Sequence, residues 1–221
     1  SEVASVNMVY GAAASGCRAM TSSSGPGISL KAEGISYLAG TQLPAVICNI
    51  SRGGPGLGSI QPAQQDYLQA TKALGHGGFK VMVFAPASLQ EAVDFTYKAW
   101  DYAERDRNPV MILMDGCLGS IMEQVELPEM KEPDRTPTDK WSLNRPETST
   151  RGDRVLTPYF PEALLELQNS SRAKMYQRWA KNDVQVEEFM LDDAEFVVVA
   201  YGIASRSAKE AIINLRKEGY K

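Results

Sequence analysis

Two stretches rich in glycine and proline, TSSSGPG at residues 21–27 and SRGGPG at residues 51–56, each follow a short apolar run. Glycine lets a ligand approach the backbone closely, and backbone amides at the start of a helix attract anions. Each stretch also contains a proline, Pro26 or Pro55, which removes one amide. Neither matches a phosphate-binding loop or a dinucleotide fingerprint. Their spacing alone fits either ordinary strand-to-helix turns or the lining of a binding pocket.

Few other side chains suggest chemistry. Arg52 directly follows an apolar run, where a guanidinium could hold a carboxylate through a bidentate pair, although most such arginines are solvated or ion-paired surface residues. His76 is the only histidine, and no Ser, Asp or Cys pattern accompanies it, so a catalytic triad is not indicated. Glu2, judged by position alone, is a terminal charge.

Composition limits the possible classes of protein. The chain has 221 residues, 43% of them hydrophobic, and a net charge of -4, so one good core is expected and nucleic-acid binding is not. No apolar run approaches the length of a membrane span, and no signal segment opens the chain, so we predict a cytoplasmic location. The scattered cysteines, Cys17, Cys48 and Cys117, predict buried thiols without a disulfide, metal or iron–sulfur site.

Helix and strand signals alternate along the chain. Apolar periodicity predicts helices at 2–15, 28–39, 66–74, 88–106, 160–181 and 205–221, and strands at 18–23, 44–50, 80–85, 109–115 and 195–202. Ser88 followed by Glu91 is typical of a helix start with a capping box. This alternation predicts an α/β fold with a doubly wound, mostly parallel sheet. Both glycine-rich stretches would then lie at the carboxyl ends of strands, where such sheets bind ligands.

The chain divides into three parts by texture. Residues 1–122 carry the regular alternation, and residues 123–192 read as an extended, charged and proline-rich connector followed by a helix. Residues 193–221 give one apolar strand and one amphipathic helix, which we interpret as the truncated start of a second α/β domain. Because one strand and one helix cannot close a domain, and because no strand precedes the first helix, we expect sequence to be missing at both ends.

The segment SEVASVNMVYGAAASGCRAMTSSSGPGISLKAEGISYLAGTQLPAVICNISRGGPGLGSIQPAQQD resembles the α subunit of 2-oxoacid:ferredoxin oxidoreductases. The similarity continues through VFAPASLQEAVDFTYKAWDYAERDRNPVMILMD and returns at LTPYFPEALLEL and LDDAEFVVVAYG, and these later segments are most like the branched-chain, 2-oxoisovalerate type. The resemblance implies the pyrimidine-binding domain of a thiamine-diphosphate enzyme, followed by the start of a transketolase C-terminal-like domain at 193–221. The reaction it implies is oxidative decarboxylation of a 2-oxoacid to acyl-CoA and CO₂, with reduction of ferredoxin.

The resemblance also assigns residue roles. Glu2 would be the glutamate that hydrogen-bonds N1′ of the aminopyrimidine and so promotes its 4′-imino tautomer, and Arg52 would meet the carboxylate of the substrate. The pyrimidine pocket would be shaped by the loop from Thr21, with Ser24, Gly25, Pro26 and Gly27. Gln65 and Asp66 would lie in the active-site loop, on the substrate side.

Two motifs of the family are absent from this chain. It contains no G-D-G followed by Asn, the usual ligands for Mg²⁺ and diphosphate, and no cysteine set for a [4Fe–4S] cluster. The resemblance places both motifs in a partner β subunit, and it adds γ and δ subunits as further possible partners. The assembly that it implies is a dimer of heteromers that uses CoA and ferredoxin. Alternatives remain open: 2-oxoglutarate or pyruvate as the substrate, a non-oxidative decarboxylase or synthase, or a non-enzymatic α/β binding or assembly module.

Overall fold

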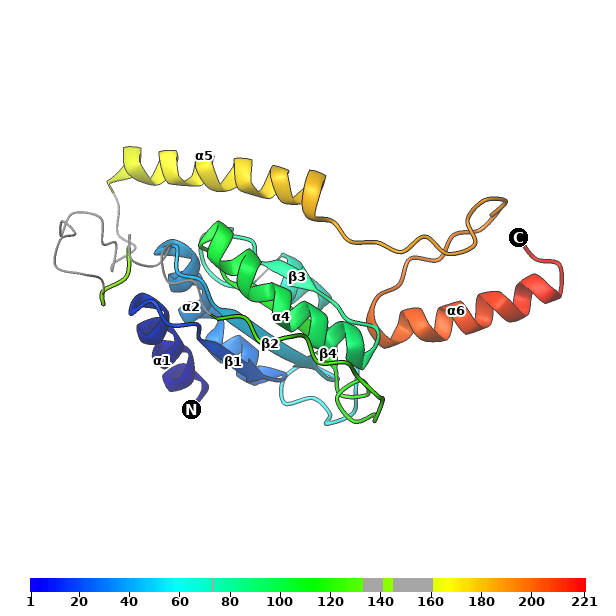
Figure 1. Ribbon diagram of the computed structural model, residues 1–221. Helices are drawn as coiled ribbons and strands as arrows, with labels where there is room; N and C mark the ends of the chain where they lie inside the picture. The colour runs from blue at the N-terminus through cyan, green and yellow to red at the C-terminus, as the bar shows by residue number, and fades with distance from the viewer. Residues whose placement is uncertain (73, 133–140, 145–160) are drawn as a thin grey trace.

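The computed structural model describes residues 1–72, 74–132, 141–144 and 161–221, which form an α/β unit built on a four-stranded parallel sheet (Figure 1). The strand order is β1-β2-β4-β3, and Val46 of β2 lies opposite both Met20 of β1 and Val110 of β4. The elements are α1 (Glu2–Ala14), β1 (Met20–Ser23), α2 (Pro26–Gly40), β2 (Val46–Ser51), α3 (Tyr67–Thr71), β3 (Met82–Phe84), α4 (Leu89–Asp106), β4 (Val110–Asp115), α5 (Glu162–Arg178), the π-helical turn η3 (Trp179–Asp183) and α6 (Gly202–Lys217).

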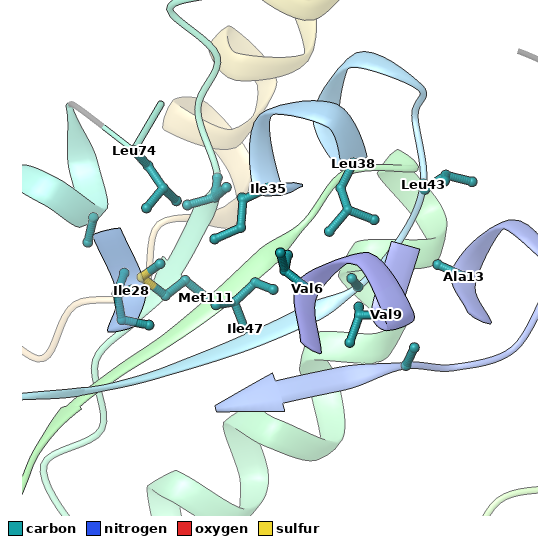
Figure 2. Packing of buried hydrophobic residues seen from close by; sticks show 14 of the residues in the cluster. Val6, Val9, Ala13, Ile28, Ile35, Leu38, Leu43, Ile47, Leu74 and Met111 are labelled. Atoms are coloured by element: carbon teal, nitrogen blue, oxygen red, sulfur yellow. The ribbon is translucent and has the colours of Figure 1, made fainter. Parts of the chain in front are cut away.

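Helices cover both faces of the sheet, as a doubly wound fold requires. On one face α1, α2 and α3 pack on the strands, and Figure 2 shows Val6 and Ile35 converging on Ile47 in this layer. On the other face Ala99 and Ala103 of α4 pack against the strands. The central strands β2 and β4 are buried on both sides, which explains their nearly continuous apolar sequences. The predicted fold class is therefore confirmed.

Local sequence explains where the long helices begin. Ser1 caps α1, with its side chain accepting a hydrogen bond from the amide of Ala4. Ser88 caps α4 by accepting from the amide of Glu91, and the Glu91 carboxylate accepts from the amide of Ala87. The predicted capping box is present, with its return bond displaced by one residue. Cap positions thus set α1 and α4 in place on the sheet.

Helix α5 lies across the amino ends of the strands and buries none of its residues. Arg172 donates to the carbonyls of Ala39 and Gly40 at the end of α2, and the Tyr176 hydroxyl accepts from the amide of Lys80 before β3. The predicted helix at 160–181 is present, but its last turn continues as η3. Polar contacts, rather than an apolar interface, hold α5 to the sheet unit.

The predicted strand at 195–202 is wrong. Residues 197–199 are extended without strand pairing, and Val197, Val198 and Val199 are 64%, 61% and 95% exposed. A β-strand needs a hydrogen-bonded neighbour along its length, and the two bonds from the amides of Glu195 and Phe196 to the carbonyl of Lys221 do not make a ladder. The next helix, α6, forms as predicted but begins earlier, at Gly202. Apolar sequence alone was insufficient to make a strand.

Two further predictions need correction or remain open. Cys48 is buried, which raises its pKa to about 11, but Cys117 is half-buried and Cys17 is exposed because it lies in a surface turn after α1. The connector at 123–132 runs over α4, where the amide of Leu89 donates to Glu123. The rest of the predicted connector lies mostly outside the described residues, and the three-part domain division stays a prediction.

Candidate functional site

The loop between β1 and α2 brings Glu2 against Gly27. A β-carbon at Gly27 would lie 2.1 Å from Oγ of Ser23 and 3.3 Å from Oε1 of Glu2, so a larger residue would require the Ser23 side chain to move. The Glu2 carboxylate makes no hydrogen bond or ion pair with the described residues. The first turn of α1 and the start of α2 therefore meet at the carboxyl edge of the sheet, with an uncommitted carboxylate between them.

Arg52 brings the second glycine-rich stretch to the same loop. Its Nε would lie 2.7 Å from a β-carbon at Gly25, and Gly25 has φ 53° and ψ -127°, a conformation that favours glycine. The guanidinium donates one hydrogen bond, to the carbonyl of Leu57 at 3.3 Å. Both glycine-rich stretches therefore face one another, and the pocket reading of their spacing gains geometric support.

Thr21, Ser24 and Pro26 complete the first loop. Oγ1 of Thr21 lies 2.5 Å from Nζ of Lys31, and the carbonyl of Ser24 accepts from the amide of Gly27 at 3.0 Å. Pro26 occupies the first turn of α2, where its missing amide has no partner to lose. The loop is thus closed by its own backbone.

Gln65 and Asp66 lie in the second loop but have structural partners. Oε1 of Gln65 accepts from the amide of Gly54 at 2.5 Å, and Oδ2 of Asp66 accepts from Nδ2 of Asn49 at 3.1 Å. Asn49 is fully buried in β2. Both side chains therefore fix the loop to the sheet edge, and the structure gives neither one a direct contact with Glu2 or Arg52.

Three buried polar atoms at this edge have no hydrogen-bond partner among the described residues: Oδ1 of Asn49, Oγ of Ser51 and Nε of Arg52. Buried polar atoms in proteins are almost always paired, so such a cluster indicates a place for a polar ligand or bound water. Neither Asn49 nor Ser51 was predicted as a site residue. The sequence could have indicated both residues, because each is a polar side chain in an otherwise apolar strand.

Lys31 is a second residue that the sequence prediction missed. It lies on the core face of α2, in line with Ile28, Ile35 and Leu38, and is 2% exposed. A lysine on the buried stripe of a helix was visible in the sequence as an exception to the pattern. Burial lowers its pKa, and the nearby charge of Glu2 acts in the opposite direction.

Tyr201 packs against the same apolar cluster as α1 and α2 and lies beside the second loop. Its ring lies 5.8 Å from that of Tyr67, and its hydroxyl donates to the carbonyl of Gln64 at 3.2 Å. Desolvation, and then the charge of Asp66, raise the pKa of this hydroxyl. His76, by contrast, lies in an exposed turn between α3 and β3, away from these residues.

Within the described ranges, no group of three His, Cys, Asp or Glu side chains could hold a metal ion, and no helix is long and apolar enough to cross a membrane. The groups at the carboxyl edge that suggest chemistry are the unpaired carboxylate of Glu2, the guanidinium of Arg52 and the buried ammonium of Lys31. Such a set can hydrogen-bond a nitrogen heterocycle and bind an anionic substrate.

The uncommitted carboxylate of Glu2 fits the aminopyrimidine of thiamine diphosphate, because a carboxyl group can hydrogen-bond a ring nitrogen. Gly25 and Gly27 allow Arg52 and Ser23 to pack closely beside this carboxylate. The residues therefore suit the pyrimidine end of the cofactor.

Comparisons with known proteins identify the family of this chain. The family model described as pyruvate flavodoxin/ferredoxin oxidoreductase, thiamine diP-binding, matches residues 1–189. A "Ketoisovalerate oxidoreductase subunit VorB" of Methanothermobacter thermautotrophicus is 48% identical over 221 residues, covering 99% of this chain and 62% of that protein. A "2-oxoglutarate synthase subunit KorA" of Methanocaldococcus jannaschii is 32% identical over 238 residues, covering 99% of this chain and 65% of that protein.

A solved structure supports the fold. The 2-oxoglutarate:ferredoxin oxidoreductase from Magnetococcus marinus matches with a TM-score of 0.77 and 24% identity, covering 100% of this chain and 43% of that chain. The present chain thus spans less than two thirds of the length of these relatives. Because the family model matches most of the sequence, the chain belongs to the thiamine-diphosphate-binding domain family of pyruvate flavodoxin/ferredoxin oxidoreductases.

Proposed function

We propose that this chain is the α-type subunit of a 2-oxoacid:ferredoxin oxidoreductase that converts a branched-chain 2-oxoacid to acyl-CoA and CO₂ and reduces ferredoxin. The observation that carries the proposal is the uncommitted carboxylate of Glu2 held 3.3 Å from the β-carbon position of Gly27, at the edge where the two glycine-rich loops meet. Family membership supports the reaction class. The 48% identity to a ketoisovalerate oxidoreductase subunit supports the branched-chain substrate.

Each site residue then has a role at a stated atom. Glu2 hydrogen-bonds N1′ of the aminopyrimidine and exchanges a proton there, since a carboxyl group can both donate and accept. Gly25 and Gly27, with Thr21, Ser24 and Pro26, shape the pyrimidine pocket. Thiamine diphosphate, when bound, supplies the carbon nucleophile and the electron sink that decarboxylation needs.

Arg52 is proposed to bind the substrate carboxylate. Its Nε is buried and unpartnered, and its guanidinium carries one long hydrogen bond, so donors remain for an anion. Gln65 and Asp66 stay assigned to the substrate side of the pocket as residues that fix the loop carrying Arg52. Arg52 would recognise the carboxylate of the 2-oxoacid and not its side chain. 2-Oxoglutarate and pyruvate therefore remain the alternative substrates to assay.

A partner subunit is part of the proposal. Leu57 and Ile60, at the tip of the Arg52 loop, are 80% and 85% exposed, and exposed apolar side chains at the rim of a site favour a protein contact. We propose that a β subunit covers this rim and contributes Mg²⁺, the diphosphate ligands and a [4Fe–4S] cluster. Further subunits, a dimer of heteromers and a cytoplasmic location belong to the same proposal.

The test is an anaerobic assay of the natural protein containing this chain, purified with its partner subunits. CoA-dependent reduction of ferredoxin would be measured with 2-oxoisovalerate, 2-oxoglutarate and pyruvate, for the wild type and for Glu2→Gln. Turnover highest with 2-oxoisovalerate, reduced at least about 100-fold in Glu2→Gln, is the expected result, because general acid–base groups contribute about 10²–10⁴-fold.

Glu33→Gln is the matched control, since Glu33 is exposed on α2 and makes the same change of charge outside the site. It should keep wild-type turnover. A complex with cofactor and cluster bound that turns over none of the three acids would contradict the proposal and favour a non-enzymatic binding module.

A further inference from the structure

Lys31 is a buried cation that the proposed reaction leaves unused. Its side chain lies among Ile28, Ile35 and Leu38 on the core face of α2 and is 2% exposed. An ammonium removed from water is unfavourable unless hydrogen bonds and opposite charge replace its hydration. A methionine of similar length would fill the same space without that cost, so the charge calls for an explanation beyond packing.

The hydrogen bonds of Lys31 reach two other elements. Nζ donates to Oγ of Ser5 on α1 and to Oγ1 of Thr21 on β1, each at 2.5 Å. No carboxylate among the described residues lies within ion-pair distance of Nζ, although the negative charge of Glu2 is close enough to favour the ammonium form. A lysine has three N–H donors, and the two hydroxyls use two of them.

Ser5 connects this ammonium to Glu2. The Ser5 hydroxyl donates to the backbone carbonyl of Glu2 at 3.0 Å, within the first turn of α1. Lys31 is therefore linked to Glu2 in two ways. It is connected to the Glu2 backbone through the Ser5 hydroxyl, and its positive charge interacts with the Glu2 carboxylate. Thr21, the third member, lies in β1, shortly before the loop that carries Gly25 and Gly27.

We propose that Lys31 is a positioning residue for Glu2, which holds the first turn of α1 against the pyrimidine loop and places a positive charge behind the carboxylate. The inference rests on the proposed function, because it concerns how Glu2 is presented to the aminopyrimidine. It assigns Lys31 no contact with cofactor or substrate.

The test uses Lys31→Met in the same anaerobic complex, with Lys72→Met as the matched control on the exposed end of α3. We expect kcat to fall about 10- to 100-fold with the KM for the 2-oxoacid within about threefold, which marks a loss confined to the transition state. Binding of thiamine diphosphate to the cofactor-depleted complex should weaken about tenfold. The melting temperature should not fall, because replacing a buried charge by an apolar side chain of similar size is often neutral.

Ser5→Ala separates this role from a packing effect. It removes the link to the Glu2 backbone and keeps the charge, so it should lower kcat severalfold, and the double variant should lose less than the product of the two single losses. Unchanged kcat and cofactor affinity in Lys31→Met would overturn the inference. The inference would also be overturned if the losses in kcat accompanied a lowered melting temperature and if the double variant lost the product of the two single losses.

Glu2→Gln keeps this test distinct from that of the proposed function. If Glu2→Gln is fully active, the role of Glu2 fails, and the inference fails with it. If Glu2→Gln is inactive while Lys31→Met matches the wild type, the proposed function stands and only the role of Lys31 is lost.

Discussion

The two edges of the sheet treat polar groups in opposite ways. At the carboxyl edge, buried atoms of Asn49, Ser51 and Arg52 have no hydrogen-bond partner among the described residues. At the amino edge, the Asp106 carboxylate is 2% exposed and accepts hydrogen bonds from Arg105, Arg178 and the indole of Trp179. Both edges are rich in polar side chains, but three buried polar atoms stay unpaired at the carboxyl edge and one, Oε1 of Gln168 on α5, at the amino edge.

The pairing of buried polar atoms distinguishes residues that anchor the fold from residues that bind a ligand, which the residue composition of the two edges does not. A buried polar atom left unpaired lowers stability, so it indicates a place for a ligand or a bound water, whereas a completed network is sufficient for anchoring. We therefore expect substitutions at the carboxyl edge to affect binding and turnover, and substitutions at the amino edge to affect stability. Each prediction below tests one side of that division.

The largest effect is expected for Gly25→Ala at the carboxyl edge. The new β-carbon would lie 2.7 Å from Nε of Arg52, and the backbone angles at Gly25 disfavour any side chain, so Arg52 must move. Displacing a binding group by about 1 Å can lower a rate about 100-fold, and we expect a loss of that size in kcat/KM for the 2-oxoacid.

Gly11→Ala is the control for that substitution. A β-carbon at Gly11 would meet nothing within 4 Å, and Gly11 lies inside α1, so alanine should raise stability by about 0.5–1 kcal/mol and leave turnover unchanged. Wild-type kcat/KM in Gly25→Ala would show that the contact between the two loops has no functional role.

A smaller effect, on stability alone, is expected for Asp106→Asn at the amino edge. An amide carries one acceptor oxygen in place of two and cannot accept all four hydrogen bonds that Arg105, Arg178 and Trp179 donate to Asp106. The free energy of unfolding should fall by about 1–3 kcal/mol, measured by denaturation of the purified complex, while turnover stays within about twofold.

Asp101→Asn gives the comparison for Asp106. Asp101 is 51% exposed and pairs with Arg18 and Lys131 at 3.8 and 3.3 Å, so its loss should lower stability by less than about 1 kcal/mol. Equal effects of the two substitutions, or a loss of turnover in Asp106→Asn, would contradict the division between the edges.

The smallest effect concerns pH at the same edge. The hydrogen bonds from Arg105, at 2.9 and 2.8 Å, hold the pKa of Asp183 below its ordinary value. Between the lowered and the ordinary pKa the unfolded state binds more protons, so this stabilisation is present above about pH 4 and is lost as the pH falls further. The protection of the η3 amides against hydrogen exchange, relative to their intrinsic exchange rate at each pH, should therefore fall below that pH.

Asp183→Asn supplies the check. Without a titrating group at this position, the η3 amides should be less protected against hydrogen exchange at neutral pH. Their protection should also change less as the pH falls below about 4. The same pH dependence in the variant and in the wild type would show that another carboxylate controls this turn.

Much of the fold was predictable because periodicity and burial agree in the sheet unit. The strands at residues 44–50 and 109–115 were predicted to within two residues, since β2 and β4 are buried on both faces and their sequences are apolar throughout. The strand at 195–202 failed because strand formation depends on a neighbour, and a neighbour cannot be read from the segment itself. The helix at residues 160–181 has a nearly right boundary, but its polar mode of attachment was not predictable.

The candidate site was predicted in part, and mainly through the family resemblance. Spacing gave both glycine-rich loops a common edge, and the structure places Arg52 against Gly25. Lys31 and Asn49 were missed because a single polar residue in an apolar pattern does not say which partners it will find. Their roles depend on contacts between elements distant in the sequence, such as Nζ of Lys31 with Ser5.

The strand order β1-β2-β4-β3 has a consequence for how the chain folds. Val46 of β2 pairs with Val110 of β4, and the Arg52 loop and α4 lie between these strands in the sequence. β2 can therefore pair with β4 only after both of those segments have been synthesised. Pairing over such a sequence separation closes slowly, because the entropy of loop closure is lost before contacts are gained. During synthesis the apolar run at 46–50 is therefore exposed until β4 emerges, and we expect this interval to be the one in which the nascent chain depends most on chaperones.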